Sequence, residues 1–397
     1  MRYRIALFLA LTMFVAAPVQ AAPAGSLVIV GGALRADNAR VWQKIVALAG
    51  GRGARIAVFP SAAGDPATAG AQAAARLARY GARPFVVPVA PRLPGVDSAA
   101  NADSAALAAR VGAAGGAFFT GGDQARITAV LLRPDGSRTR VLEALWGLYQ
   151  RGGVIAGTSA GAAMMSTTMF HDPRPLPALL EEGIAEGRDV APGLGFVGAD
   201  VFIDQHAIIR GRFARMLPVL LARGYRYGLG IDENTALVVG PRRQVTVLGY
   251  KGALLLETSA AAVDAGRAFN LADARISYLD DGDRLDLDSG ALMPGPDKRP
   301  LAGVPPAVRG PLLSADILGN TSVVDLMEKL VDSDQQEAVG LALGAPGPGQ
   351  ALGFRFRLAR VAGSAGYAST VSQANSVHRL RLDVEPVRFA LPLYAPR

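Results

Sequence analysis

The sequence predicts an α/β protein with a mostly parallel sheet that is covered by helices on both faces. Short runs such as Ser26–Val30 and Arg55–Pro60 are apolar almost throughout, which is typical of strands buried on both sides. Between them, Asn38–Leu48 carries apolar residues at helical spacing. Strands that alternate with helices in this way form parallel sheets, because a parallel connection needs a long crossover.

The same alternation continues as far as Ala156. Further helices are expected over 68–80, 99–111, 125–132 and 140–149, with strands over 84–89, 116–120 and 154–156. From Gly228 the pattern changes to short strands separated by turn residues, which predicts an antiparallel flank over 229–231, 236–239, 245–250 and 253–257. Residues 26–291 are therefore predicted to form one α/β domain.

The segment 292–311 is rich in proline and glycine, and its composition predicts a linker. Residues 312–397 are predicted to form a C-terminal α+β appendage. Within it we expect a helix over 323–343 and strands over 353–361 and 377–391.

The first 21 residues have the pattern of a secretory signal peptide: a basic start, an apolar run from Ile5 to Val15, and small residues up to Ala21. This predicts a secreted or periplasmic protein that does not stay in the membrane after cleavage. The chain has no cysteine, so it has no disulfide framework.

The net charge of +8 comes mainly from arginine, since 41 basic residues oppose 33 acidic ones. These arginines are dispersed and only 6% of residues are aromatic, which does not favour nucleic-acid binding. A mild positive excess is compatible with a ligand that carries carboxylates, although a solvated basic surface would also explain it.

Gly157–Gly161 is a G-x-S-x-G sequence that follows an apolar strand and precedes a run of small residues. In this context Ser159 is expected to project from a tight strand-to-helix turn as a nucleophile. The N–H of Ala160, at the start of the next helix, is a candidate donor to an oxyanion. The structural alternative is a serine that only caps the helix.

Three histidines are available as the base, and His206 is favoured because it ends the apolar run 199–203 at the carboxyl edge of a strand. His171 is expected in a loop, and His378 on the exposed side of an appendage strand. The acid that orients the imidazole is expected to be Glu233, after the strand that ends at Ile231, while Asp204 stays open as the alternative.

Gly121–Gln124 follows another strand and precedes a helix. Glycines at this position allow backbone N–H groups, including that of Gly122, to approach a ligand, and Gln124 is a candidate for holding it. An ordinary loop with Asp123 as the helix cap is the structural alternative.

Taken together, four motifs resemble the cyanophycinase family, within the wider group of peptidase E-like serine peptidases. Their order and spacing match over roughly Val28 to Leu287. The motifs are Phe119–Gln124, Gly157–Ala162, Asp204–His206 with the arginines at 210, 212 and 215, and Gly230–Thr235.

The resemblance implies a flavodoxin-like fold, often a homodimer, in which Ser159 is the nucleophile, His206 the base and Glu233 its acidic partner. It also implies a substrate, cyanophycin, which is a polyaspartate whose side-chain carboxyls carry arginine and which is cut to β-Asp-Arg dipeptides. The residues it places around the substrate are Gln124, Asp204, Gln205, Arg210, Arg212 and Arg215. Arginine forks bind carboxylates in bidentate fashion, and Asp204 is the candidate for a guanidinium group. The arginines 212 and 215 also fit the polar side of a helix.

Three other functions stay open: an aspartyl dipeptidase of the same group, a secreted esterase that uses His378, and a binding protein that has lost catalysis. The acidic run 280–288 lacks the terminal glutamate of an EF-hand and is expected to form a hairpin. Hydrolysis by serine and histidine requires no metal and no cofactor, and none is predicted.

Overall fold

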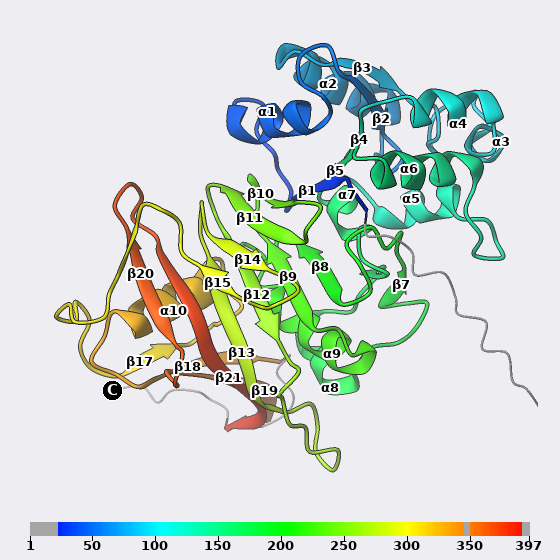
Figure 1. The fold of residues 1–397 in the computed structure, drawn as a ribbon. Coiled ribbons are helices and arrows are strands. Elements are labelled where there is room, and N and C mark those ends of the chain that lie inside the picture. Colours follow the sequence, from blue (N-terminus) through cyan, green and yellow to red (C-terminus); the bar gives the residue numbers. More distant parts are fainter. Residues whose placement is uncertain (1–22, 345–349, 391–397) are drawn as a thin grey trace, which may run out of the picture.

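A computed structural model describes residues 23–344 and 350–390. Within these residues the chain forms a 9-stranded and a 10-stranded sheet, together with a two-stranded ribbon (Figure 1). The predicted α/β class is confirmed, with a second, largely antiparallel sheet in addition. The predicted signal peptide lies outside the described residues. No helix of the described part is long and apolar enough to cross a bilayer.

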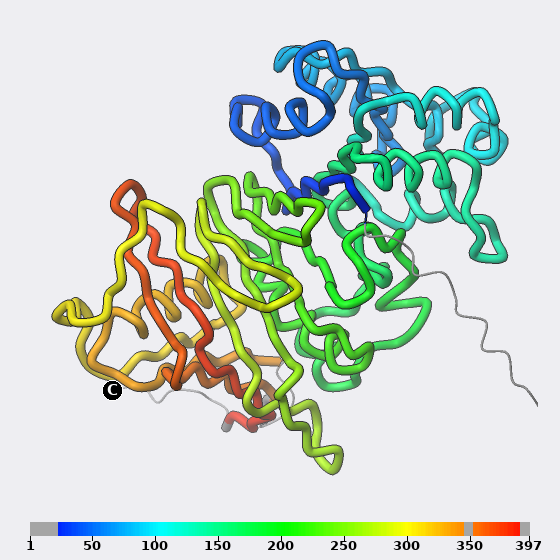
Figure 2. Tube along the Cα trace, viewed as in Figure 1, coloured from blue at the N-terminus to red at the C-terminus, as the bar shows by residue number. Residues whose placement is uncertain are grey.

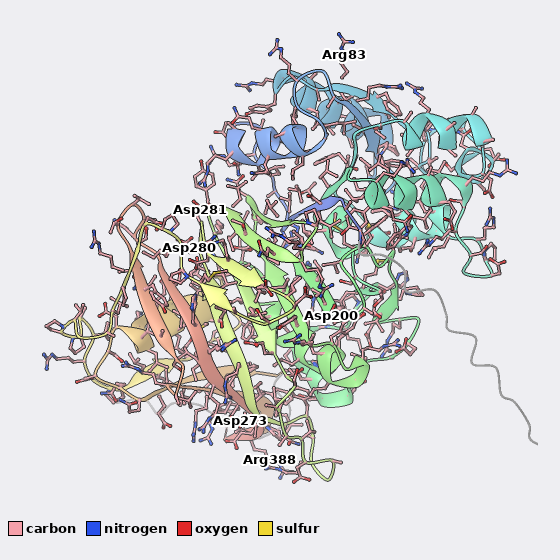
Figure 3. The ribbon with its side chains drawn as sticks, viewed as in Figure 1. Arg83, Asp200, Asp273, Asp280, Asp281 and Arg388 are labelled. Atoms are coloured by element: carbon pink, nitrogen blue, oxygen red, sulfur yellow. The ribbon has the colours of Figure 1, made fainter. Side chains whose placement is uncertain are left out.

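The first sheet has a parallel centre and an antiparallel flank. The parallel strands, in spatial order, are β1 (Ser26–Val30), β5 (Val154–Thr158), β4 (Gly116–Phe119), β2 (Arg55–Phe59) and β3 (Arg83–Val86). The flank, which begins beside β1, consists of β10 (Thr235–Val239), β11 (Gln244–Gly249), β14 (Arg284–Asp286) and β15 (Leu292–Met293). Arg83 projects from the edge strand β3 (Figure 3).

Helices cover both faces of this sheet, as the apolar strands require. One face packs against α1 (Ala39–Leu48) and α2 (Pro66–Arg79). The other packs against α4 (Ala105–Gly112), α5 (Gln124–Leu131) and α6 (Arg140–Gln150). The single helix predicted over 99–111 is wrong, because it divides into α3 (Ser98–Ala102) and α4. The Ser104 hydroxyl, which accepts a hydrogen bond from the N–H of Leu107 at 3.3 Å, caps the start of α4.

The second sheet joins the middle of the chain to its C-terminal part. Eight of its strands lie in the order β17 (Leu312–Ser314), β18 (Glu337–Leu343), β19 (Gln350–Ala359), β21 (Asn375–Ala390), β13 (Leu271–Leu279), β12 (Ala253–Glu257), β9 (Tyr227–Ile231) and β8 (Val201–Gln205). The other two branch from β21, which pairs with β20 (Ala365–Ser369), and β20 pairs with β16 (Lys298–Pro300). The strands β8 and β9 are parallel and are connected through α9 (Phe213–Arg223). Figure 2 shows the blue and cyan N-terminal part on one side of the molecule and the yellow to red C-terminal part on the other.

The remaining elements are short or pack on the second sheet. They are α7 (Ala160–Ala163), β6 (Thr168–Phe170), α8 (Leu176–Glu182), β7 (Val190–Pro192), β16 (Lys298–Pro300), α10 (Ser322–Val331) and β20 (Ala365–Ser369). Thus β15 and β16 lie within the stretch whose composition predicts a linker, and the strands β18, β19 and β21 share a sheet with β8 and β9. The boundaries of a separate C-terminal unit stay a prediction.

The helix predicted over 323–343 is wrong beyond Val331. From Glu337 to Leu343 buried residues alternate with more exposed ones, which is the period of a strand, and this segment pairs with β19 as β18. A run of small and apolar residues is compatible with either structure until its partner strand is known.

The acidic run 280–288 does not form a single hairpin. Residues 280–283 connect β13 of the second sheet with β14 of the first, and β14 pairs with β11 and β15. Figure 3 labels Asp280 and Asp281 of this connection. The ammonium of Lys298 lies inside this connection, 3.2 Å from Asp280 Oδ2 and 3.4 Å from Asp283 Oδ1. A buried lysine therefore compensates the charge of these carboxylates.

Candidate active site

Ser159 stands at the end of β5 in a strained backbone conformation, with φ 54° and ψ −110°. Its N–H donates to the carbonyl of Val30 at 3.0 Å, which anchors the turn to the neighbouring strand. A Cβ atom on Gly157 would lie 2.2 Å from the carbonyl oxygen of Gly161, so only glycine permits this close turn. The G-x-S-x-G sequence thus forms the projecting turn that its context predicts.

The Ser159 hydroxyl lies within hydrogen-bond distance of His206, and His206 lies within hydrogen-bond distance of Glu233. Ser159 Oγ lies 2.9 Å from His206 Nε2, and His206 Nδ1 lies 2.7 Å from Glu233 Oε1. His206 itself has a positive φ of 52°, and its N–H donates to the carbonyl of Gly31 at 2.8 Å. A side chain at Gly32 would strike the imidazole, since its Cβ would lie 2.2 Å from Cε1.

These three side chains come from two different sheets. Ser159 follows β5 of the first sheet, whereas His206 follows β8 and Glu233 follows β9 of the second (Figure 1). The sequence correctly predicts that each lies after the carboxyl end of a strand, but it does not reveal that the strands belong to separate sheets.

Burial lowers the pKa of His206 below its ordinary value of 6.5, and the nearby Arg210 and Arg212 lower this pKa further. The hydrogen bond to Glu233 and its negative charge act in the opposite direction. The net effect keeps the imidazole neutral at physiological pH, which is the form that accepts a proton from a hydroxyl.

The choice between Glu233 and Asp204 as the acidic partner is decided by Arg215. Both carboxylate oxygens of Asp204 accept from this guanidinium, at 2.7 and 2.8 Å. Asp204 is only 1% exposed, so the expectation that it binds a substrate guanidinium directly is wrong. Arg215 also lies flat on Phe170, with its guanidinium carbon 4.1 Å from the ring centroid, so Asp204 holds Arg215 in place.

A pocket of about 500 Å³ opens in front of Ser159. Of the six residues predicted to surround a substrate, all but Asp204 line it: Gln124, Gln205, Arg210, Arg212 and Arg215. Gly122, predicted as an oxyanion donor, lines it as well. In the described structure neither Arg210 nor Arg212 forms an ion pair with a carboxylate. Burial and the neighbouring Arg215 lower the pKa of Arg212 to about 10. The pocket thus presents positive charge that the protein itself leaves uncompensated.

The amide of Gln124 is partly engaged, because its Nε2 donates to the carbonyl of Phe170 at 2.6 Å. Its amide oxygen is left for a ligand. Phe170, His171 and Pro173 also line the pocket, and sequence reasoning missed this role. Their position just after the Ser159 helix was the available signal, since a segment leaving a nucleophile turn often borders the same site.

The backbone N–H groups of Gly122 and Ala160 make no hydrogen bond within the described structure. Gly122 has a φ of 143°, and a Cβ there would lie 2.0 Å from the carbonyl oxygen of Ala62. Gly121 brings this loop against Ser159, where its own Cβ would be 3.3 Å from the serine Cβ. Two free donors beside a nucleophile have the chemistry of an oxyanion site.

His378 differs from its prediction, because it is buried in β21 with 4% exposure rather than standing on an exposed strand face. Burial and the nearby Lys298 and Arg379 lower its pKa to about 4, and its ring packs on Tyr367. It does not line the pocket in front of Ser159. The geometry therefore gives no support to an esterase that would use His378 as its base.

The chain is similar to known peptidases over this part of the sequence. Residues 27–244 match the family model of Peptidase family S51. A cyanophycinase of Geminocystis herdmanii is 30% identical over 283 residues, which cover 68% of this chain and 96% of that protein. A cyanophycinase of Trichormus variabilis is 30% identical over 287 residues, covering 69% of this chain and 89% of that protein.

Among solved structures, the chain is similar to a peptidase from an acI-B1 Actinobacterium. It is 22% identical, has a TM-score of 0.45, and the match covers 59% of this chain and 91% of that one. On the family match and the extent of the sequence similarity, the chain belongs to peptidase family S51.

Proposed function

We propose that this protein is a serine-type cyanophycinase that releases β-Asp-Arg dipeptides from cyanophycin. The observation that carries the proposal is the contact of 2.9 Å between Ser159 Oγ and His206 Nε2 at the mouth of a pocket with unpaired arginines. The relatives named as cyanophycinases support the choice of substrate.

In the proposed reaction Ser159 Oγ attacks the main-chain carbonyl carbon while its proton passes to His206 Nε2. The N–H groups of Gly122 and Ala160 stabilise the oxyanion that forms. The amine then leaves with the proton from His206, and an ester remains on Ser159. Water, deprotonated by His206, hydrolyses this ester and restores the hydroxyl. Glu233 holds the imidazole in the required tautomer and stabilises its charged form.

The pocket supports this substrate by its charge. Each unit of cyanophycin carries the free carboxylate of an arginine, and Arg210 and Arg212 offer guanidinium groups that no protein carboxylate compensates. The oxygens of Gln124 and Gln205 can accept from the substrate guanidinium. We also propose that the protein acts outside the cytoplasm, as the pattern of residues 1–21 predicts, and that it forms a homodimer.

The direct test is to incubate the purified protein with insoluble cyanophycin and to identify the soluble product by mass spectrometry. We expect β-Asp-Arg from the unmodified protein and none from Ser159→Ala. His378→Gln is the matched control and should retain activity. A panel of α-linked Asp dipeptides is assayed in parallel; if these are cut while cyanophycin is not, the protein is an aspartyl dipeptidase and the proposal is wrong.

A further inference from the structure

Ser159 borders a second pocket, separate from the one that contains the arginines. This pocket has a volume of about 420 Å³, and Thr120, Gly121 and Thr158 line it together with Ser159. Its outer wall comes from α1 and α2, which cover the opposite face of the first sheet from α5. Ser159 therefore lines two pockets, and of these two only the pocket with the arginines is also lined by His206.

The helix α2 presents one regular stripe to this second pocket. Ala69, Gln72, Ala73 and Arg76 line it, at the spacing that places residues on one face of a helix. The two alanines leave room, while Gln72 and Arg76 supply polar ends. Arg76 is half-buried and makes no hydrogen bond or ion pair within the described structure.

Two threonines of the pocket lining carry buried hydroxyl groups without partners. Oγ1 of Thr120 and Oγ1 of Thr158 each lack a hydrogen bond in the described structure, and Thr120 is 6% exposed. Buried polar groups are nearly always hydrogen-bonded, so an unmatched pair is unusual. Protein atoms cover both oxygens, so a ligand reaches them only if neighbouring side chains move, and the polar group that the pocket offers directly is Arg76.

We propose that this second pocket, which we call the α2 pocket, binds the leaving unit of the polymer and that Arg76 recognises a carboxylate on that unit. The inference rests on the proposed function. A leaving β-Asp-Arg unit carries the carboxylate of its arginine and, at the end of a chain, the main-chain carboxylate of its aspartate. Arg76 is the cation in the α2 pocket, and guanidinium groups pair with carboxylates in bidentate geometry.

The assignment of the two pockets follows from the two steps of the reaction. The acylated unit must be held during both ester formation and ester hydrolysis, so it requires the pocket with more fixed polar groups. That is the pocket with Gln124, Gln205 and the arginines. The leaving unit must depart after the first step, which suits the α2 pocket with its single cation.

The test compares two soluble substrates with wild-type protein and with Arg76→Gln. One is a dimer of β-Asp-Arg with a free carboxyl end, and the other is a single β-Asp-Arg whose main-chain carboxyl forms a 4-nitroanilide, an uncharged leaving group. We expect Arg76→Gln to raise KM for the dimer by roughly tenfold or more and to change that for the anilide by less than about twofold. Arg76→Lys should recover part of the loss.

Arg79→Gln is the matched control, because Arg79 lies on the same helix but is exposed and does not line the α2 pocket. Equal losses on both substrates would overturn the inference, since Arg76 would then act on the acylated unit or on Ser159. No loss on either would also overturn it. If the wild type cleaves neither substrate although a phosphonate labels Ser159, the proposed function itself is wrong, and the inference falls with it.

Discussion

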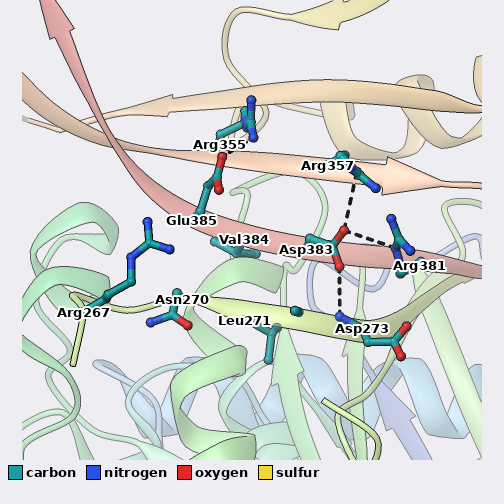
Figure 4. A pocket seen from close by; sticks show the side chains of 11 residues that line it. Arg267, Asn270, Leu271, Asp273, Arg355, Arg357, Arg381, Asp383, Val384 and Glu385 are labelled. Carbon is teal, nitrogen blue, oxygen red and sulfur yellow. Dashed lines mark hydrogen bonds and ion pairs between the residues drawn. The ribbon is translucent and has the colours of Figure 1, made fainter. Parts of the chain in front are cut away.

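Two pockets of this molecule contain similar side chains but differ in how many of their arginines pair with a carboxylate. The active-site pocket at Ser159 has Arg210 and Arg212 without carboxylate partners. The pocket of about 360 Å³ formed mainly by β13, β19 and β21, called here the C-terminal pocket, is lined by four arginines, against three in the active-site pocket (Figure 4).

In the C-terminal pocket three of the four lining arginines pair with carboxylates of the same pocket, while Arg267 forms no ion pair within the described residues. Arg381 Nε lies 3.1 Å and Arg357 Nε 3.5 Å from Asp383 Oδ2, and Arg355 pairs with Glu385 (Figure 4). The pairs Arg357–Asp383 and Arg355–Glu385 connect β19 with β21, while Arg381 and Asp383 lie on the same strand. Together they stabilise a sheet surface and leave little charge for a ligand. The comparison teaches that the number of arginines in a pocket indicates binding less well than the number left without a carboxylate.

The largest expected effect concerns the hydrogen bond between Glu233 and His206, which has no counterpart in the C-terminal pocket. Glu233→Gln should lower kcat by about 10⁴-fold, because a glutamine amide no longer holds the imidazole in the tautomer that accepts the serine proton. Steady-state hydrolysis of cyanophycin measures it. Glu186→Gln, which removes an exposed ion pair with Arg223, is the control and should stay within about twofold of wild type. A mild effect of Glu233→Gln would mean that another group orients His206.

The next effect separates a buried ion pair from an exposed one. Asp204→Asn should lower the free energy of unfolding by about 3–5 kcal/mol, because it leaves the charge of Arg215 buried without its partner. Asp273→Asn, in the C-terminal pocket, removes an ion pair with Arg275 whose acid is 53% exposed, and should cost at most about 1 kcal/mol. Urea unfolding measures both, and similar losses would break the comparison.

A smaller effect tests ligand binding by the uncompensated arginines. Arg210→Gln should raise KM for cyanophycin oligomers by roughly tenfold to a hundredfold, as expected for the loss of a charged hydrogen bond to the substrate. Arg355→Gln, in the C-terminal pocket, should leave KM unchanged. The reverse result would assign substrate binding to the C-terminal pocket.

The smallest effect is a shift in pH dependence. kcat/KM should fall towards acidic pH as His206 takes up a proton, with a midpoint below 6.5 because burial lowers the pKa of this histidine. Arg210→Gln removes a positive neighbour, which favours the protonated imidazole, so the midpoint should rise by less than about one pH unit. The pH profile of kcat/KM measures this, and a midpoint that falls or stays fixed would contradict it.

Much of the active site follows from the sequence because its residues sit directly after strands. Ser159, His206 and Glu233 each do so, and the tight turns at Gly32 and Gly157 require glycine. The three arginines, by contrast, cannot be ranked from the sequence. Only the fold shows that Arg215 is used by Asp204 while Arg210 stays available, since the pairing depends on how α9 packs against β8.

The two sheets also differ in how well the sequence predicts them, because one depends on local patterns and the other on long-range pairing. The parallel strands of the first sheet are predicted well, because each is apolar and is followed by a helix within a short distance. The second sheet is predicted poorly, because β13 pairs with β21 about a hundred residues later, and no local pattern records such a partner. The helix prediction over 337–343 is wrong for a different reason, because its small and apolar residues fit a helix or a strand, and only the pairing with β19 decides between them.

Because Ser159 follows a strand of the first sheet and His206 follows a strand of the second, the hydroxyl and the imidazole meet only when the two sheets are in place together. The sheet that positions His206 and Glu233 is itself completed by long-range pairing, since β13 pairs with β21 about a hundred residues later. A partly folded chain that has formed only the first sheet therefore has its serine turn but lacks the base that activates it.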